Sequence, residues 1–258
     1  SSGRGGDLWI RYPDGTQRNL TEQAGYGNSG LQGANAIGVR DPSVDWTGTK
    51  VIFSMVVGAP VRYQWNTYYW QLYEVTGLGE GGTATITKVP NQPANANNIQ
   101  GTYTSDGSIV FASDQPRDGQ PNLYPQLDEY ESVPSLTGLW KLGPGGTGPA
   151  VLLENSPSGS FTPFVDSFGR IIFTRWDHLQ RDQQADAGTH GAFNWSSEAP
   201  NAVPLNTDVE VFPEPRMGDP TTNEYHDMNH FFPWALNQDG THEETINHIG
   251  RHELFQYF

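Results

Sequence analysis

Cysteine is absent from the 258 residues, and this absence removes several classes of site. The chain has no disulfide, no thiolate metal ligand and no catalytic cysteine, and no covalent haem can be attached through a C-x-x-C-H motif. Basic residues are also scarce, because 14 Lys and Arg stand against 29 Asp and Glu and give a formal net charge of −15. Binding to a phosphate backbone needs clustered basic side chains, so we expect no nucleic-acid partner.

Long apolar runs are missing as well. No stretch approaches the ~18 consecutive apolar residues of a transmembrane helix, so we expect no membrane insertion. The chain begins SSGRGG, without Met or the apolar core of a signal peptide, so we expect any export signal to have been cleaved or left out. We expect an extracytoplasmic location, periplasmic or secreted.

Aromatic residues, in contrast, are plentiful. The chain has 8 Trp, 11 Tyr and 12 Phe, which supply the large apolar side chains of a packed core that a disordered chain would lack. With 30 Gly and 19 Pro it is also rich in turn residues. These features predict a folded protein with many short elements joined by turns.

A strand with an aromatic centre, followed by a glycine turn, recurs four times. A short β-prone segment follows each turn, so each copy predicts a hairpin. The aligned aromatic residues are Trp9, Tyr73, Trp140 and Trp234, in residues 7–15 (DLWIRYPDG), 71–77 (QLYEVTG), 138–146 (GLWKLGPGG) and 232–240 (FPWALNQDG).

A second recurring unit lies between successive copies of the first. In this unit a glycine turn precedes three consecutive β-formers, a short apolar run that is typical of a strand buried on both faces. Its copies are residues 43–54 (SVDWTGTKVIFS), 103–113 (YTSDGSIVFAS) and 164–175 (FVDSFGRIIFTR). Two hairpins per repeat predict a four-stranded antiparallel sheet, and such sheets at a period of ~60 residues are the signature of β-propeller blades.

We therefore predict an all-β fold, a β-propeller or partial propeller, forming one domain over residues 1–258. The alternative is a β-sandwich whose hairpins are similar by chance. The repeat units lie near residues 7–58, 71–119, 138–182 and 232–258. Because these units do not complete a ring, we expect a fragment of a longer chain, closure with a partner, or an irregular closure. The long segments expected to be functional loops are 21–40, 114–134 and 183–229.

The repeat resembles the TolB-type, WD-like propeller repeat. Residues 169–182 (GRIIFTRWDHLQRD) and 234–241 (WALNQDGT) more closely resemble the propeller of the hydrazine synthase alpha subunit and its relatives. In that family a strand ending T-R-W-D precedes Asp and Arg residues, and a W-x-M-N-x-D-G-T hairpin follows; here Leu236 replaces the Met. The resemblance implies a propeller fold and, as an alternative function, an enzyme subunit. Relatives with redox chemistry carry haem on cysteine-containing motifs, which this chain lacks.

The densest polar cluster follows the third branched run. Adjacent carboxylate and imidazole groups could support acid–base chemistry or bind a metal, so Asp177 and His178 are candidate catalytic residues. The alternative is a structural network in which Asp177 pairs with a neighbouring arginine and caps turn amides. The candidate binding residues around them are Arg175, Trp176, Arg181 and Asp182.

A histidine pair suggests a metal site. His226 and His230 are four residues apart, as in the zinc motif H-E-x-x-H, but Asp227 occupies the position of the Glu and an aromatic strand follows. We therefore weigh a metal site that uses one or both histidines with Asp177 or Asp227 against ordinary polar loop residues. Acidic residues that could bind Ca²⁺, or simply form a solvated loop, are Asp114, Asp118, Asp128, Glu129 and Glu131.

No complete catalytic constellation is present, and no G-x-S-x-G elbow occurs. We therefore expect a propeller scaffold or binding module that presents its long loops to a protein partner or a small ligand. Two alternatives stay open. One is a metal-dependent enzyme subunit related to the hydrazine synthase alpha subunit, and the other is a structural propeller stabilised by Ca²⁺. The candidate cofactors are accordingly Ca²⁺ or a transition metal.

Overall fold

A computed structural model describes residues 6–27, 36–58, 68–116, 137–154, 159–178, 194–195, 204–206 and 229–246. For residues 176–178, 194–195, 204–206 and 229–230 it describes the backbone alone. The chain divides into two compact units, Ser1–Ser113 with Lys141–Val151, and Asp114–Trp140 with Leu152–Phe258. Strands β1 to β8 belong to the first unit, and strands β11 to β16 to the second.

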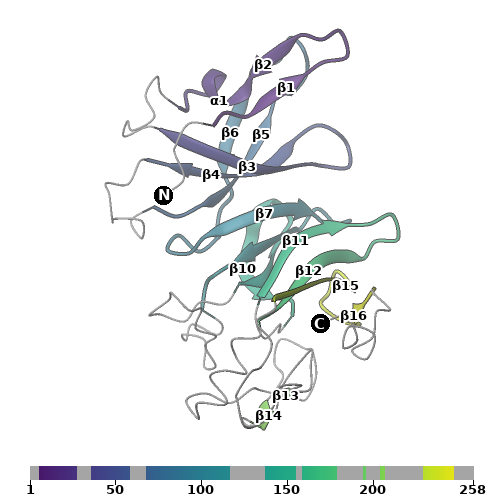
Figure 1. Ribbon diagram of the computed structural model, residues 1–258. Coiled ribbons are helices and arrows are strands. Elements are labelled where there is room, and N and C mark those ends of the chain that lie inside the picture. The colour runs from purple at the N-terminus through teal and green to yellow at the C-terminus, as the bar shows by residue number, and fades with distance from the viewer. Residues whose placement is uncertain are drawn as a thin grey trace. The chain divides into compact units, whose positions relative to one another are not determined.

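The fold is all-β, with four-stranded antiparallel sheets of the propeller-blade type (Figure 1). Sheet I contains β3 (Ile37–Val44), β4 (Val51–Val57), β5 (Gln71–Thr76) and β6 (Thr85–Lys88). Sheet II contains β7 (Asn98–Tyr103), β8 (Ile109–Ser113), β9 (Gly138–Gly143) and β10 (Thr147–Leu152). Sheet III contains β11 (Gly159–Val165), β12 (Ile171–His178), β15 (Asn229–Leu236) and β16 (Glu244–Thr245).

Smaller elements complete the described part of the chain. Strands β1 (Trp9–Arg11) and β2 (Gln17–Asn19) form a hairpin that leads into the short helix α1 (Leu20–Gln23). Strands β13 (Asn194–Trp195) and β14 (Pro204–Asn206) form a separate pair, and a 3₁₀ turn, η3 (Pro144–Gly146), joins β9 to β10. Within the described ranges, no helix has the length and apolar character needed to cross a bilayer.

The strand register confirms that the sequence repeats are structural repeats. In each sheet the first two strands come from the unit with the run of three β-formers, and the last two strands come from the aromatic unit that follows it in sequence. The sheets therefore begin one hairpin later than the repeat units of the sequence. In sheet I Tyr73 lies opposite Phe53, and in sheet III Trp234 lies opposite Phe173. The aligned aromatic residues therefore occupy the same place in the two sheets.

Each sheet also has a bulge in its first strand, which the sequence pattern did not predict. Two residues of the first strand face a single phenylalanine of the second, and the first of these two has a positive φ. The residues at positive φ are Asp41, Gln100 and Thr162, and the phenylalanines are Phe53, Phe111 and Phe173. All three phenylalanines are at most 2% exposed. Because a bulge interrupts ladder hydrogen bonding, it makes the edge of each sheet a poor template for further strand pairing.

The hairpin turns are held by aspartates. In the β7–β8 turn Asp106 accepts hydrogen bonds from the Thr104 hydroxyl (2.6 Å) and the Ser108 amide (3.0 Å). These bonds stabilise the charged form and lower the pKa of Asp106 to about 2. Gly107 follows at φ 80°, a conformation that glycine adopts without strain. This is why an Asp-Gly pair occupies the turn between β7 and β8.

The segment 21–40, expected as one long loop, contains regular structure at both ends. Helix α1 occupies its start, where the Asn19 side chain accepts a hydrogen bond from the Glu22 amide and so caps the helix. Strand β3 begins at Ile37 and includes its end. The start of this strand was not predicted from the sequence, because Ile37 and Val39 alone give only a short alternating apolar pattern there.

Strand β7 covers one face of sheet I through close backbone contact. A Cβ atom at Gly101 would lie only 2.9 Å from Ile52 Cδ1 and 3.1 Å from Leu72 Cδ2, so β7 packs directly on these side chains. Next to it, the Gln100 amide donates to Ser54 Oγ at 3.0 Å. Ile52, Leu72 and Ser54 are all 0% exposed.

At the end of this contact a tyrosine of β7 binds two charged residues of sheet I. The Tyr103 hydroxyl donates to Glu74 Oε1 at 2.7 Å, and Lys50 Nζ binds the same oxygen at 2.7 Å. Lys50 Nζ also lies 4.5 Å from the centre of the Tyr103 ring, a cation–π contact. Burial and the neighbouring Glu74 carboxylate raise the pKa of Tyr103, so the phenol is a hydrogen-bond donor at any physiological pH.

Candidate functional site

Arg175, a predicted binding residue, lies in a buried ion pair of sheet III. Its Nη1 is 3.1 Å from Glu243 Oε1, and the two side chains are 3% and 2% exposed. The guanidinium carbon lies 4.3 Å from the centre of the Trp234 ring. A guanidinium held by a carboxylate and an indole in a dry environment fixes the geometry of the sheet. The carboxylate is that of Glu243, which the sequence analysis did not single out.

The backbone register brings together two predicted sites that the sequence kept apart. On β12 and β15, Asp177 lies directly opposite His230, and His178 lies directly opposite Asn229. Opposed positions on neighbouring strands share one face of a sheet, with Cβ atoms about 5 Å apart. One candidate catalytic residue and one candidate metal ligand are therefore neighbours in the fold. Trp176 is opposite Phe231 in the same ladder.

Several predictions lie outside the described residues. These are Arg181 and Asp182, the ligand candidates His226 and Asp227, and the loop 183–229 apart from its two short strands and Asn229. The same holds for loop 114–134 beyond residue 116, and so for most of the candidate Ca²⁺ ligands. Within the part of the chain that the structure describes, no three His, Cys, Asp or Glu side chains gather closely enough to hold a metal ion.

Sheet III has a face, here called the Phe164 face, that corresponds to the face of sheet I under β7. The Phe164 face consists of Phe164, Ile172, Thr174, Pro233, Ala235 and Glu244. The correspondence follows from register, because Ile52 lies opposite Glu74 in sheet I and Ile172 lies opposite Ala235 in sheet III.

Exposure differs between these two faces at some of the equivalent positions, although Ile172 (9% exposed) and Ala235 (1% exposed) are buried on sheet III. Leu72 is 0% exposed in sheet I, whereas Pro233 at the equivalent position of sheet III is exposed. Ser54 is likewise fully buried, whereas the equivalent Thr174 is partly exposed. Phe164 on the first strand is 53% exposed. Phe164 and Pro233 are therefore exposed apolar residues on this face.

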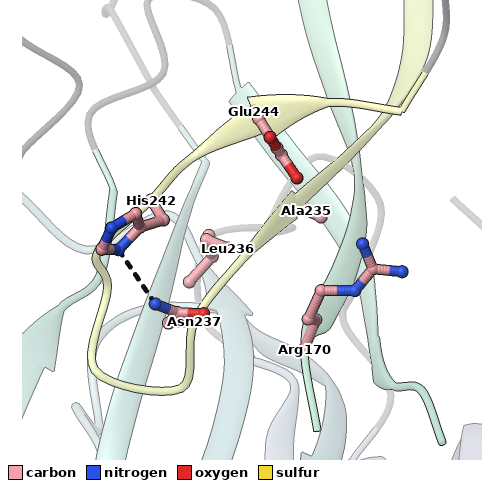
Figure 2. A pocket seen from close by; sticks show the side chains of 6 residues that line it. All are labelled: Arg170, Ala235, Leu236, Asn237, His242 and Glu244. Carbon is pink, nitrogen blue, oxygen red and sulfur yellow. Dashed lines mark hydrogen bonds between the residues drawn. The ribbon is translucent and has the colours of Figure 1, made fainter. Parts of the chain in front are cut away.

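A hollow of about 240 Å³ lies at one end of the Phe164 face. Figure 2 shows Arg170 and His242 on opposite sides of the strand that carries Ala235 and Leu236, with Glu244 on the next strand. The side chains that line it are Arg170, Ala235, Leu236, Asn237, His242 and Glu244. The hollow therefore combines an apolar floor with a cation, a carboxylate, an amide and an imidazole.

At the hollow a small residue stands where sheet I has a large one. Ala235 occupies the position that Glu74 has in sheet I, and Arg170 occupies that of Lys50 at the start of the second strand. The carboxylate of Glu244 stands one strand farther out, opposite Ala235. Cation and carboxylate thus remain on this face, with an alanine at the position of the glutamate.

The charged and polar groups at the rim are held in place. Arg170 Nε and Nη2 both donate to Asp166 Oδ2, at 3.0 and 2.9 Å, and the guanidinium lies 5.6 Å from the centre of the Phe168 ring. Although burial acts to raise it, the pKa of Asp166 is lowered by hydrogen bonds from the Arg170 amide and side chain. On the other side Asn237 Nδ2 and His242 Nδ1 are 3.1 Å apart. These side chains at the rim are therefore held by contacts within the chain.

Sequence reasoning missed these rim residues for an identifiable reason. Arg170 follows a turn glycine and Glu244 lies beyond the Asp-Gly turn at 239–240, so both look like ordinary polar turn residues. The signal that could have found the hollow is the repeat alignment itself. Placing Ala235 beside Glu74 shows a large side chain replaced by a small one on a strand that is otherwise similar.

Comparison with known proteins finds structural likeness but no sequence relative. No protein-family model and no curated protein matches the sequence. Among solved structures, the chain is similar to Kuenenia stuttgartiensis hydrazine synthase, with a TM-score of 0.48 and 13% sequence identity. The alignment covers 91% of this chain and 27% of that one, so the chain spans about a quarter of the length of the protein it matches.

Proposed function

We propose that this protein is a binding module of the propeller type that recognises a protein partner through the Phe164 face of sheet III. The observation that carries the proposal is the difference between equivalent faces. Leu72 and Ser54 are buried completely on sheet I, whereas the equivalent Pro233 and Thr174 on sheet III are exposed and partly exposed, and Phe164 on the same face is 53% exposed. Burial of such a surface against a partner is the main source of affinity at protein interfaces.

In this function a TolB-like, WD-like repeat forms the scaffold, and the long loops provide further contacts with the partner. Loops 114–134 and 183–229 would extend the surface or admit a small ligand, although nearly all of both lies outside the described residues. The net charge of −15 favours a partner with a basic surface around an apolar centre, because complementary charge speeds association and selects among partners. An extracytoplasmic location remains part of the proposal.

Photocrosslinking tests this function. With p-benzoylphenylalanine at position 164, in cells that naturally produce the protein, we expect an adduct with one protein that mass spectrometry identifies. The matched control is Val151, which is 57% exposed and lies in the other compact unit. With the identified partner purified, Phe164→Glu should weaken binding about tenfold or more, because it places a charge in an apolar contact. Unchanged binding of Phe164→Glu would reject the Phe164 face as the binding surface.

A second candidate function, a metal-dependent enzyme subunit, is favoured by one observation, the opposition of Asp177 and His230 in the β12–β15 ladder. Elemental analysis of the purified protein separates the two. If the protein is a binding module, we expect the purified sample to contain much less than one transition-metal ion per chain. A stoichiometric transition metal that is lost in both Asp177→Asn and His230→Gln would favour the enzyme instead. Calcium alone, unaffected by these variants, would favour a structural ion.

A further inference from the structure

We propose that the hollow on the Phe164 face receives a tyrosine side chain from an edge strand of the partner protein. This inference rests on the proposed function and specifies what the partner presents. It comes from a contact that the chain makes within itself. On sheet I the equivalent place is occupied by Tyr103, which β7 brings over Lys50 and Glu74.

The hollow offers the same two interactions in a rearranged form. Arg170 stands where Lys50 stands, and a guanidinium stacks on an aromatic face at least as well as an ammonium does. Glu244 supplies a carboxylate one strand away from the position of Glu74, where it can accept a hydrogen bond from a phenol hydroxyl. A cation for the ring and an acceptor for the hydroxyl are the features that distinguish tyrosine from phenylalanine.

The size of the hollow fits this side chain. A cavity of ~150 Å³ holds benzene, and the hollow of about 240 Å³ leaves room for the hydroxyl and the Cβ atom. In sheet I the Glu74 side chain takes up part of the corresponding space, so Tyr103 contacts its carboxylate directly at 2.7 Å. With Ala235 in that position, the phenol ring would reach deeper and its hydroxyl would point towards the neighbouring strand.

A β-strand is the natural carrier of this tyrosine. On sheet I the tyrosine arrives at the end of β7, whose Gly101 lies close against Ile52 and Leu72. The Phe164 face offers the equivalent apolar pair, Ile172 and Pro233. We therefore expect the partner strand to have a small residue two positions before its tyrosine, as β7 has Gly101 before Tyr103.

The test uses N-acetyl-L-tyrosinamide and N-acetyl-L-phenylalaninamide as probes, titrated into the intact protein and followed by amide chemical shifts. We expect shifts at Ala235, Asn237 and Glu244, with the tyrosine probe binding about threefold or more tightly than the phenylalanine probe. Ala235→Glu, which restores the residue that sheet I has, should abolish binding of both probes. Glu244→Ala should leave the hollow in place and remove the preference for tyrosine.

Other outcomes would overturn the inference. Equal binding of the two probes, no shifts at the hollow, or binding that persists in Ala235→Glu would show that the hollow does not select tyrosine. Binding only after deletion of residues 247–258 would assign the hollow to the chain's own C-terminal residues. Self-association of the protein that Phe164→Glu abolishes would assign it to a second copy. A different result would reject the proposed function. In that case the identified partner would bind Phe164→Glu as tightly as it binds the wild type.

Discussion

Replacing Glu243 by alanine is expected to lower the free energy of unfolding by about 3–5 kcal/mol, the cost of removing one partner of a buried ion pair. The Arg175 side chain is 3% exposed, so water cannot take the place of the lost carboxylate. The Trp234 ring at 4.3 Å still faces the guanidinium and should place the loss towards the lower end of this range. Urea denaturation measures the loss, and hydrogen exchange of the β12 and β15 amides locates it in sheet III.

Glu244 provides the matched control for this prediction. It is the next residue in sequence and is exposed, so Glu244→Ala should change stability by less than about 0.5 kcal/mol. The double variant Arg175→Met with Glu243→Leu should recover most of the lost stability, because it removes both charges and leaves apolar groups of similar volume. A Glu243→Ala variant as stable as Glu244→Ala would show that the pair contributes nothing to the sheet.

The architecture could be predicted from the sequence because its signals are local. A branched run such as Ile109-Val110-Phe111 and an Asp-Gly turn each specify a few consecutive residues, and their recurrence specifies the sheet. The register of Tyr73 and Trp234 follows from the same alignment. The bulges escaped prediction because Asp41, Gln100 and Thr162 share no residue type, and each reaches a positive φ through its place in the strand.

The candidate site was less accessible to sequence reasoning because its contacts are distant in sequence. Arg175 was selected as a polar residue at the end of a strand, but its partner Glu243 lies 68 residues away and nothing local marks it. Asp177 and His230 were each considered as ligands, yet only the β12–β15 register shows them to be neighbours. Which carboxylate faces which cation is decided by the packing of strands and not by residue type.

The second large effect that we expect is binding of a peptide, copied from a hairpin of this chain, to the Phe164 face of the intact protein. The hairpin of residues 98–113 contains β7 and β8 and carries the tyrosine that covers sheet I. Asn98 and Ser113 are opposite each other, so a second two-residue turn can join them and close a cyclic peptide. Closure reduces the ordering cost that makes isolated hairpins poor ligands.

The most direct test of the account is therefore calorimetric titration of the intact protein with this cyclic peptide. The account predicts one binding site with a Kd of about 100 µM or tighter. Phe164→Glu should weaken the binding about tenfold or more, and Val151→Glu, an equally exposed position in the other unit, should leave it unchanged. Absence of binding, or equal binding to the wild type and Phe164→Glu, would contradict the claim that the Phe164 face is a docking surface.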